Sequence, residues 1–131
     1  MGKEVKNVLI DTSAWVEFFR NNPETADTVT KIIEDGRACI CGVIYFELLQ
    51  GIRTGEDPGR LIDLLTALDF MEITAEIWIK AGSISAALRK QGTTLPMSDL
   101  LIAATAIERG LSVLTYDEHF SSIPGLNLYR Q

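Results

Sequence analysis

The feature that most constrains this chain is a short apolar run that ends in a carboxylate, Val8-Leu9-Ile10-Asp11. An unbroken run of Val, Leu and Ile is typical of a parallel strand that is buried on both faces. The hydroxyl residues Thr12 and Ser13 follow, and they open a predicted helix over 14–19. We therefore expect Asp11 at the carboxyl end of a buried strand, which is the edge of an open α/β sheet where ligands bind. An Asp at this place also serves as an ordinary helix N-cap, so the position alone favours neither role.

The remaining sequence alternates between strand and helix patterns. Further strands are predicted at 38–41, 70–73, 112–115 and 126–129. Helices are predicted at 24–34, 43–51, 60–68, 74–90 and 95–109, the last nearly all apolar and stopped by Gly110. In the helix over 74–90, a stripe that includes Trp78 and Ala81 is expected to pack in the core. Alternation of this kind predicts right-handed crossovers and a doubly wound parallel sheet.

Length and composition indicate one domain over residues 1–131, with the polar loop 53–59 as the nearest thing to an internal boundary. We find no apolar run near the ~20 residues that span a bilayer and no signal peptide, so a cytoplasmic protein without membrane contact is expected. Cys39 and Cys41 are expected to be core thiols. The net charge of -6 first argues against nucleic acid. Acids that bind cations distort this count, however, so the charge neither supports nor excludes an RNA substrate.

Three further acids stand in places comparable to that of Asp11. Glu47 has apolar neighbours on both sides, Asp99 opens the apolar helix over 95–109, and Asp117 follows the apolar strand over 112–115. Each has a plainer explanation as well: Glu47 fits a solvated helix face, and the helix dipole favours an acid at Asp99 by ~0.3–1 kcal/mol. If the four carboxylates converge, their repulsion raises their pKa values and weakens the fold unless cations neutralise them.

These residues indicate a class of chemistry. A set of oxygen ligands with no His or Cys predicts Mg²⁺ or Mn²⁺ rather than zinc. Such ions stabilise the attacking and leaving oxygens of an in-line displacement, and a carboxylate can orient or deprotonate the water. Hydrolysis of a phosphodiester fits this inventory and needs no covalent nucleophile.

The chain resembles the PIN domain, and in particular the VapC-type ribonuclease toxins of toxin–antitoxin pairs. The resemblance rests on segments 8–13, 45–48, 98–104 and 114–120 and extends over nearly the whole chain. It implies a PIN-like three-layer α/β/α fold with a central, mainly parallel sheet. It also implies Mg²⁺- or Mn²⁺-dependent endonucleolytic cleavage of single-stranded or loop regions of RNA, a homodimer, and a cognate VapB-type antitoxin that inserts a segment into the acidic groove.

The resemblance assigns roles to particular residues. Asp11, Glu47 and Asp99 match the three acids that the family shares most firmly, and Asp117 matches the fourth. All four are thereby implied as metal-binding and catalytic residues, and Thr12 and Thr115 match hydroxyl positions that assist the site. In many relatives the fourth acid stands two places later, where this chain has His119. For His119 we favour a surface or packing role over that of general base.

Two other classes of function are considered: a phosphatase or phosphotransfer domain of similar architecture, and a non-catalytic binding module. A haloacid-dehalogenase-like phosphatase requires a second Asp two places after the first, where this chain has Ser13. A receiver domain of the phosphotransfer class requires an early acidic pair and a late Lys after a strand, and neither is present. A non-catalytic PIN-like module that binds RNA or protein stays open, although the presence of all four acids favours catalysis.

Overall fold

The computed structural model describes residues 6–52 and 57–130. These residues form five strands, six α-helices and one short 3₁₀ helix. The strands are β1 (Val8–Ile10), β2 (Ala38–Cys41), β3 (Asp69–Met71), β4 (Ser112–Leu114) and β5 (Asn127–Leu128). The helices are α1 (Thr12–Phe19), α2 (Pro23–Glu34), α3 (Gly42–Gln50), α4 (Pro58–Thr66), α5 (Ala75–Lys90), α6 (Met97–Arg109) and the 3₁₀ helix η1 (Glu118–Ser122).

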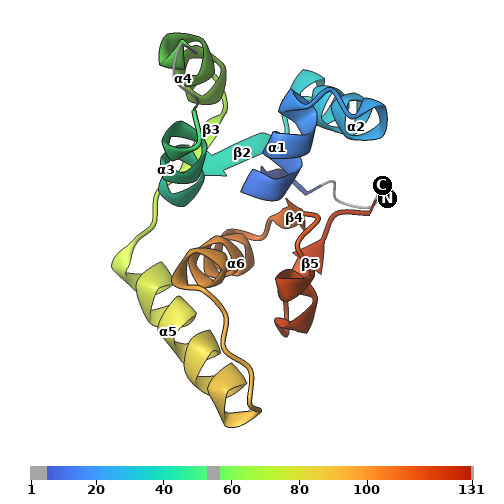
Figure 1. Cartoon of the computed structure of the whole chain (residues 1–131). Coiled ribbons are helices and arrows are strands. Elements are labelled where there is room, and N and C mark those ends of the chain that lie inside the picture. The colour runs from blue at the N-terminus through green and yellow to red at the C-terminus, as the bar shows by residue number, and fades with distance from the viewer. Residues whose placement is uncertain (1–5, 53–56, 131) are drawn as a thin grey trace, which may run out of the picture.

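The strands form one sheet in the order β3-β2-β1-β4-β5, and every pair is parallel. Leu9 in the central strand β1 pairs with Cys39 of β2 and with Val113 of β4. The chain moves outward from β1 to β3 and then returns past β1 to β4, so right-handed crossovers place α1 to α4 on one face and α5 and α6 on the other (Figure 1). The predicted three-layer α/β/α fold is confirmed, and the strand order reverses between β1 and β4.

Burial follows the sequence pattern closely. The side chains of β1 and the last three residues of β2 are fully buried, as expected for strands covered on both faces. Helix α6 is buried from Asp99 to Ala106, and its small Ala residues allow it to lie close to the sheet. Cys39 and Cys41 are free and buried, as predicted. Of the helices in the described residues, none has both the length and the apolar character needed to cross a membrane.

A few local predictions were wrong or lie beyond what the structure describes. Trp78 is 49% exposed, because Ile77 takes the core position at the start of the stripe on α5. The 3₁₀ helix η1 occupies 118–122, a segment for which the sequence predicted no helix. Most of the predicted polar loop at 53–59 falls on residues 53–56, outside the described residues.

Candidate active site

Asp11 lies at the point where the strand order reverses. It follows β1 directly, its backbone N–H donates to the carbonyl of Leu114 at 2.9 Å, and its side chain is only 4% exposed. The carboxyl ends of β1 and β4 are thus joined at Asp11. This is the crevice where open α/β sheets bind ligands.

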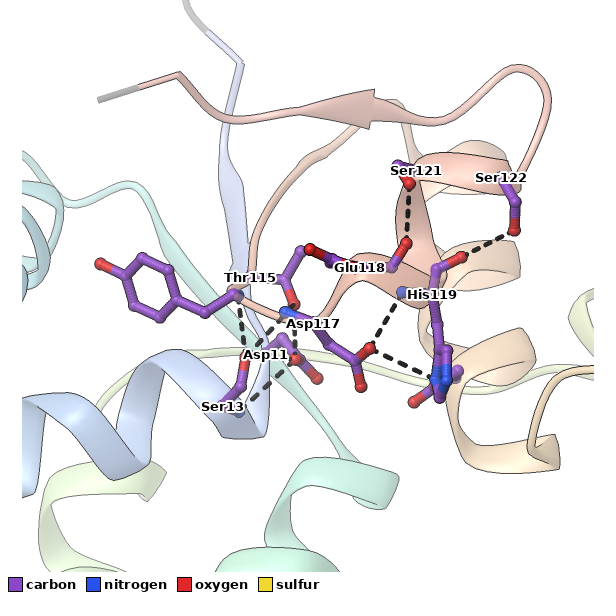
Figure 2. A network of polar contacts seen from close by, with 10 residues as sticks. Asp11, Ser13, Thr115, Asp117, Glu118, His119, Ser121 and Ser122 are labelled. Atoms are coloured by element: carbon purple, nitrogen blue, oxygen red, sulfur yellow. Dashed lines mark hydrogen bonds and ion pairs between the residues drawn. The ribbon is translucent and has the colours of Figure 1, made fainter.

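Two hydroxyl groups hold the Asp11 carboxylate by one of its oxygens. Oδ2 of Asp11 accepts hydrogen bonds from Ser13 Oγ and from Thr115 Oγ1, each at 2.8 Å (Figure 2). Ser13 Oγ accepts from the N–H of Tyr116 at 3.0 Å, and Thr115 Oγ1 accepts from the N–H of Asp117 at 3.0 Å. No described hydrogen bond ends on Oδ1. The carboxylate is therefore oriented with one oxygen left for a ligand.

Glu47 reaches the site from α3. Its Oε1 accepts a 2.7 Å hydrogen bond from the hydroxyl of Thr12, the first residue of α1. Burial raises the pKa of the Cys41 thiol, and the charges of Asp11 and Glu47 raise it further, so both acids lie near this cysteine. Glu47 is half-buried and bound to another helix, so it is not a freely solvated residue on an outer helix face.

Asp99, Asp117 and His119 form a compact group. Asp99 stands in the first turn of α6 and is 9% exposed. Nδ1 of His119 lies 2.9 Å from Oδ2 of Asp99 and 3.3 Å from Oδ1 of Asp117. Asp117 caps η1, and its Oδ1 also accepts from the backbone N–H of His119 at 2.9 Å. One ligand atom from each of the three residues lies within 4.8 Å of the others.

The group formed by Asp99, Asp117 and His119 contains more carboxylates than positively charged groups. Burial raises the pKa of Asp99, the hydrogen bond from His119 opposes this, and the charges of Asp117 and Asp11 raise it further. The hydrogen bond to Asp99 in turn raises the pKa of His119. One imidazole thus faces several carboxylates at the edge of the sheet. A divalent cation fits this donor set because it neutralises acids that otherwise repel one another.

The structure brings the four predicted acids to one end of the sheet in two groups. Asp99 and Asp117 meet at His119, Asp11 lies within electrostatic reach of Asp99, and Glu47 is joined to the turn after β1 through Thr12. Their roles as metal ligands stay predictions. Thr12 and Thr115 each donate a hydrogen bond to a predicted acid, and their supporting role in a metal site likewise stays a prediction.

Sequence reasoning missed two residues of this site. The hydroxyl of Ser13 donates a hydrogen bond to Asp11, and its position two residues after the acid is the sequence signal that could have predicted this contact. His119 was expected on the surface or in packing, and its ring instead contacts two of the acids. The sequence had suggested a set of oxygen donors alone. With His119 beside the acids, the donor set also includes a nitrogen atom.

Comparison with known proteins identifies the fold and family. The PIN domain family matches residues 8–126. This chain belongs to the PIN-domain family. This chain is 33% identical over 121 residues to a VapC ribonuclease of Mycobacterium bovis, and the alignment covers 88% of this chain and 90% of that protein. It is 27% identical over 125 residues to the tRNA(fMet)-specific endonuclease VapC of Salmonella typhimurium, with 92% and 94% covered.

Solved structures agree with this assignment. The DNA-bound VapBC of Salmonella typhimurium superposes on this PIN domain with a TM-score of 0.81 and 26% identity, over 95% of this chain and 98% of that one. The DNA-bound VapBC2 of Rickettsia felis gives the same TM-score at 20% identity, with the same coverage. The chain is thus a PIN domain of the VapC type along nearly its whole length.

Proposed function

We propose that this PIN domain is a metal-dependent endoribonuclease, the toxin of a VapBC-type pair, and that it acts on RNA in the cytoplasm. Residues 1–131 would work as a single nuclease domain. The observation that carries the proposal is the gathering of Asp11, Glu47, Asp99 and Asp117 where the strand order reverses. The VapC ribonucleases related to it over most of its length support the same activity.

In this proposal the four acids hold Mg²⁺, with Mn²⁺ as a substitute. An ion held there would supply a water molecule of lowered pKa and would neutralise charge on the phosphate oxygens. Ser13 and Thr115 keep Oδ1 of Asp11 turned to the site. Thr12 occupies Oε1 of Glu47 and leaves Oε2, on which no described hydrogen bond ends, for the ion or for the attacking water. Thr12 and Thr115 thereby act as supporting groups rather than ligands.

A shallow hollow beside the site offers room for the RNA. It has a volume of about 480 Å³ and is lined by Glu17, Asn22, Glu24, Thr25, Tyr116, Tyr129 and Arg130. Tyr116 is exposed, directly precedes Asp117, and shares a 2.7 Å hydrogen bond between its hydroxyl and that of Thr25. An aromatic ring held in this way supports stacking of a base next to the scissile phosphate. Tyr45 is less suited to stacking a base because its ring already stacks on Phe70.

The activity is tested with purified protein and total cellular RNA in Mg²⁺ or Mn²⁺. We expect discrete products that disappear with EDTA, and at least about a 100-fold lower rate for Asp11→Asn and Asp99→Asn, since each change removes a charged ligand. Asp63→Asn, which removes an exposed acid from α4, should cleave like the wild type. Mn²⁺ should raise the melting temperature of the wild type but not that of Asp99→Asn.

The alternative function is a PIN module that binds RNA or protein without cleaving it. If neither the wild type nor Asp11→Asn cleaves RNA with either ion, in a preparation shown to contain no bound partner, this alternative is favoured. In that event the wild type should still retain single-stranded RNA in a gel-shift assay without metal.

We also propose a homodimer and a VapB-type antitoxin as partners. The VapBC complexes among the structural neighbours support the antitoxin. Several large apolar side chains of the described surface are exposed, including Phe46 on α3 at 67% and Ile79 on α5 at 69%. The acidic groove favours an antitoxin Arg, whose guanidinium binds carboxylates in pairs. Co-expression with a small protein encoded next to this chain should yield a complex that no longer cleaves RNA. Normal growth of cells that express this protein alone would argue against this pairing.

A further inference from the structure

His119 is the only histidine of the chain, and Figure 2 shows its ring turned toward Asp117. We propose that Nδ1 of His119 is a ligand in the metal site, beside the carboxylates of Asp99 and Asp117, and that the site therefore prefers Mn²⁺ to Mg²⁺. This inference rests on the proposed function, because it concerns the ion that the nuclease would use.

The distances from Nδ1 of His119 to the two carboxylate oxygens match those between neighbouring ligands on one ion. Around an octahedral ion with bonds of about 2.1 Å, adjacent ligand atoms lie about 3.0 Å apart and opposite ones about 4.2 Å apart. Nδ1 lies 2.9 Å from the Asp99 oxygen and 3.3 Å from the Asp117 oxygen, which are distances of the first kind. A proton on Nδ1 satisfies these contacts in the absence of an ion, and a bound ion would displace it to the solvent.

The local fold holds the ring in this place. Oδ1 of Asp117 accepts from the backbone N–H of His119 at 2.9 Å, so the turn that begins η1 directs both side chains to the same side. The next residue, Phe120, is fully buried and anchors the turn in the core. The side chain of His119 is itself about half exposed, which leaves room for the water molecules that complete the shell of such ions.

A nitrogen ligand changes which ion the site favours. Mg²⁺ takes oxygen ligands almost exclusively, whereas imidazole binds divalent transition-metal ions, with an affinity that rises from Mn²⁺ toward Co²⁺. A site of carboxylates alone would discriminate little between Mg²⁺ and Mn²⁺. The imidazole of His119 gives the transition metal an added contact that Mg²⁺ uses poorly.

Calorimetric titration of protein without a histidine tag tests the preference directly. We expect the wild type to bind Mn²⁺ at least about tenfold more tightly than Mg²⁺, and His119→Ala to lose most of this margin while it still binds Mg²⁺. His119→Asp should bind Mg²⁺ at least as well as the wild type. Glu118→Gln, an exposed neighbour on the same turn whose side chain makes no described hydrogen bond, should keep the wild-type ratio.

The single histidine also provides a readout in the wild type that needs no variant. Zn²⁺ serves as a diamagnetic probe, and its binding should shift the ¹⁵N resonance of Nδ1 strongly and that of Nε2 weakly. A Nδ1 signal that does not move at saturation would overturn the proposal, as would an unchanged ratio of Mn²⁺ to Mg²⁺ affinity in a folded His119→Ala.

The two proposals fail in different ways. Metal-dependent RNA cleavage with either of those negative results would remove the role of His119 alone. If no ion binds and no RNA is cleaved, the proposed nuclease and the His119 ligand both fall.

Discussion

Asp11 owes its orientation to hydroxyl groups from two turns that are distant in the sequence. Ser13 comes from the start of α1 and Thr115 directly follows β4, and both donate to the same oxygen, Oδ2. Ser13 also accepts from the backbone of Tyr116, so it ties the two turns to each other as well as to the acid. Loss of a group that orients a ligand in this way typically lowers metal affinity by about 10- to 100-fold.

Replacement of Ser13 by Ala should therefore weaken the metal site without unfolding the protein. We expect a 10- to 100-fold loss of Mn²⁺ affinity, roughly the range for groups that orient ligands, together with about 1 kcal/mol of lost stability. Titration calorimetry and urea unfolding measure the two effects. Ser83→Ala is the matched control, since that hydroxyl is exposed on α5 and bonds only its own helix. Wild-type affinity in Ser13→Ala would show that Thr115 alone orients the acid.

Cys39 offers a prediction about pH. Burial, with a smaller effect from the charge of Asp69, raises the pKa of this thiol to about 11 from 9.0. The folded protein thus keeps the thiol protonated where the unfolded chain ionises, so stability that is complete below pH 9 is lost as the pH rises toward 11. The loss amounts to about 1.4 kcal/mol per pH unit over this window. Urea unfolding at pH 8 to 11 should show a shallower decline for Cys39→Ala, and parallel declines would contradict the assignment.

At the scale of elements, the ends of the helices place the acids. Asp11 and Asp117 are N-caps of α1 and η1, and Asp99 lies in the first turn of α6. The structural and functional roles of Asp11 are thus compatible, because the same carboxylate faces both the helix and the site. The end of α6 also determines the position of an acid. Gly110 ends this helix and leads the chain into β4, and Asp117 follows that strand.

Two glycines should respond to the same substitution in opposite directions. Gly110 has a φ of +68°, and an added Cβ meets nothing within 4 Å, so the cost of Gly110→Ala is backbone strain of about 1–2 kcal/mol. Gly82 lies inside α5 in ordinary helical conformation with equally open space, so Gly82→Ala should stabilise the protein by about 0.5–1 kcal/mol. Chemical denaturation of both variants checks the signs, and equal signs would refute this account.

At the scale of the whole molecule, exposed apolar side chains are the candidates for the proposed dimer interface. Ile79 is 69% exposed on the sixteen-residue helix α5. Exposure of single apolar residues is common, so a test by mutation is needed to distinguish an interface from ordinary surface.

If α5 contributes to the proposed homodimer, Ile79→Glu should convert the protein to a monomer, because a buried unpaired carboxylate costs several kcal/mol. Light scattering coupled to size-exclusion chromatography gives the mass. Lys80→Glu, which changes charge on the same helix beside Ile79, is the control and should leave the mass unchanged. A dimeric Ile79→Glu would exclude this face of α5 from the interface.

The sequence by itself determined the elements and the layer order of this molecule. Unbroken apolar strands such as Val8–Ile10, caps and stop signals such as Gly110 act over a few residues, so they can be read without the fold. The four acids were found for the same reason: each follows a strand or stands in a helix where an acid is locally unusual. Trp78 was misplaced because neighbouring positions on a helix differ little in pattern and only packing decides between them.

Only the tertiary structure decided how the acids are held. The contacts of Asp11 with Thr115 and of Asp99 with His119 join residues that are far apart in the sequence. No local pattern encodes such contacts, because they arise when parallel strands align their carboxyl ends and a helix packs beside them. The place of His119 among the acids is the clearest case. As a residue of the sequence it is a lone histidine, and in the fold it is a nitrogen donor at the proposed metal site.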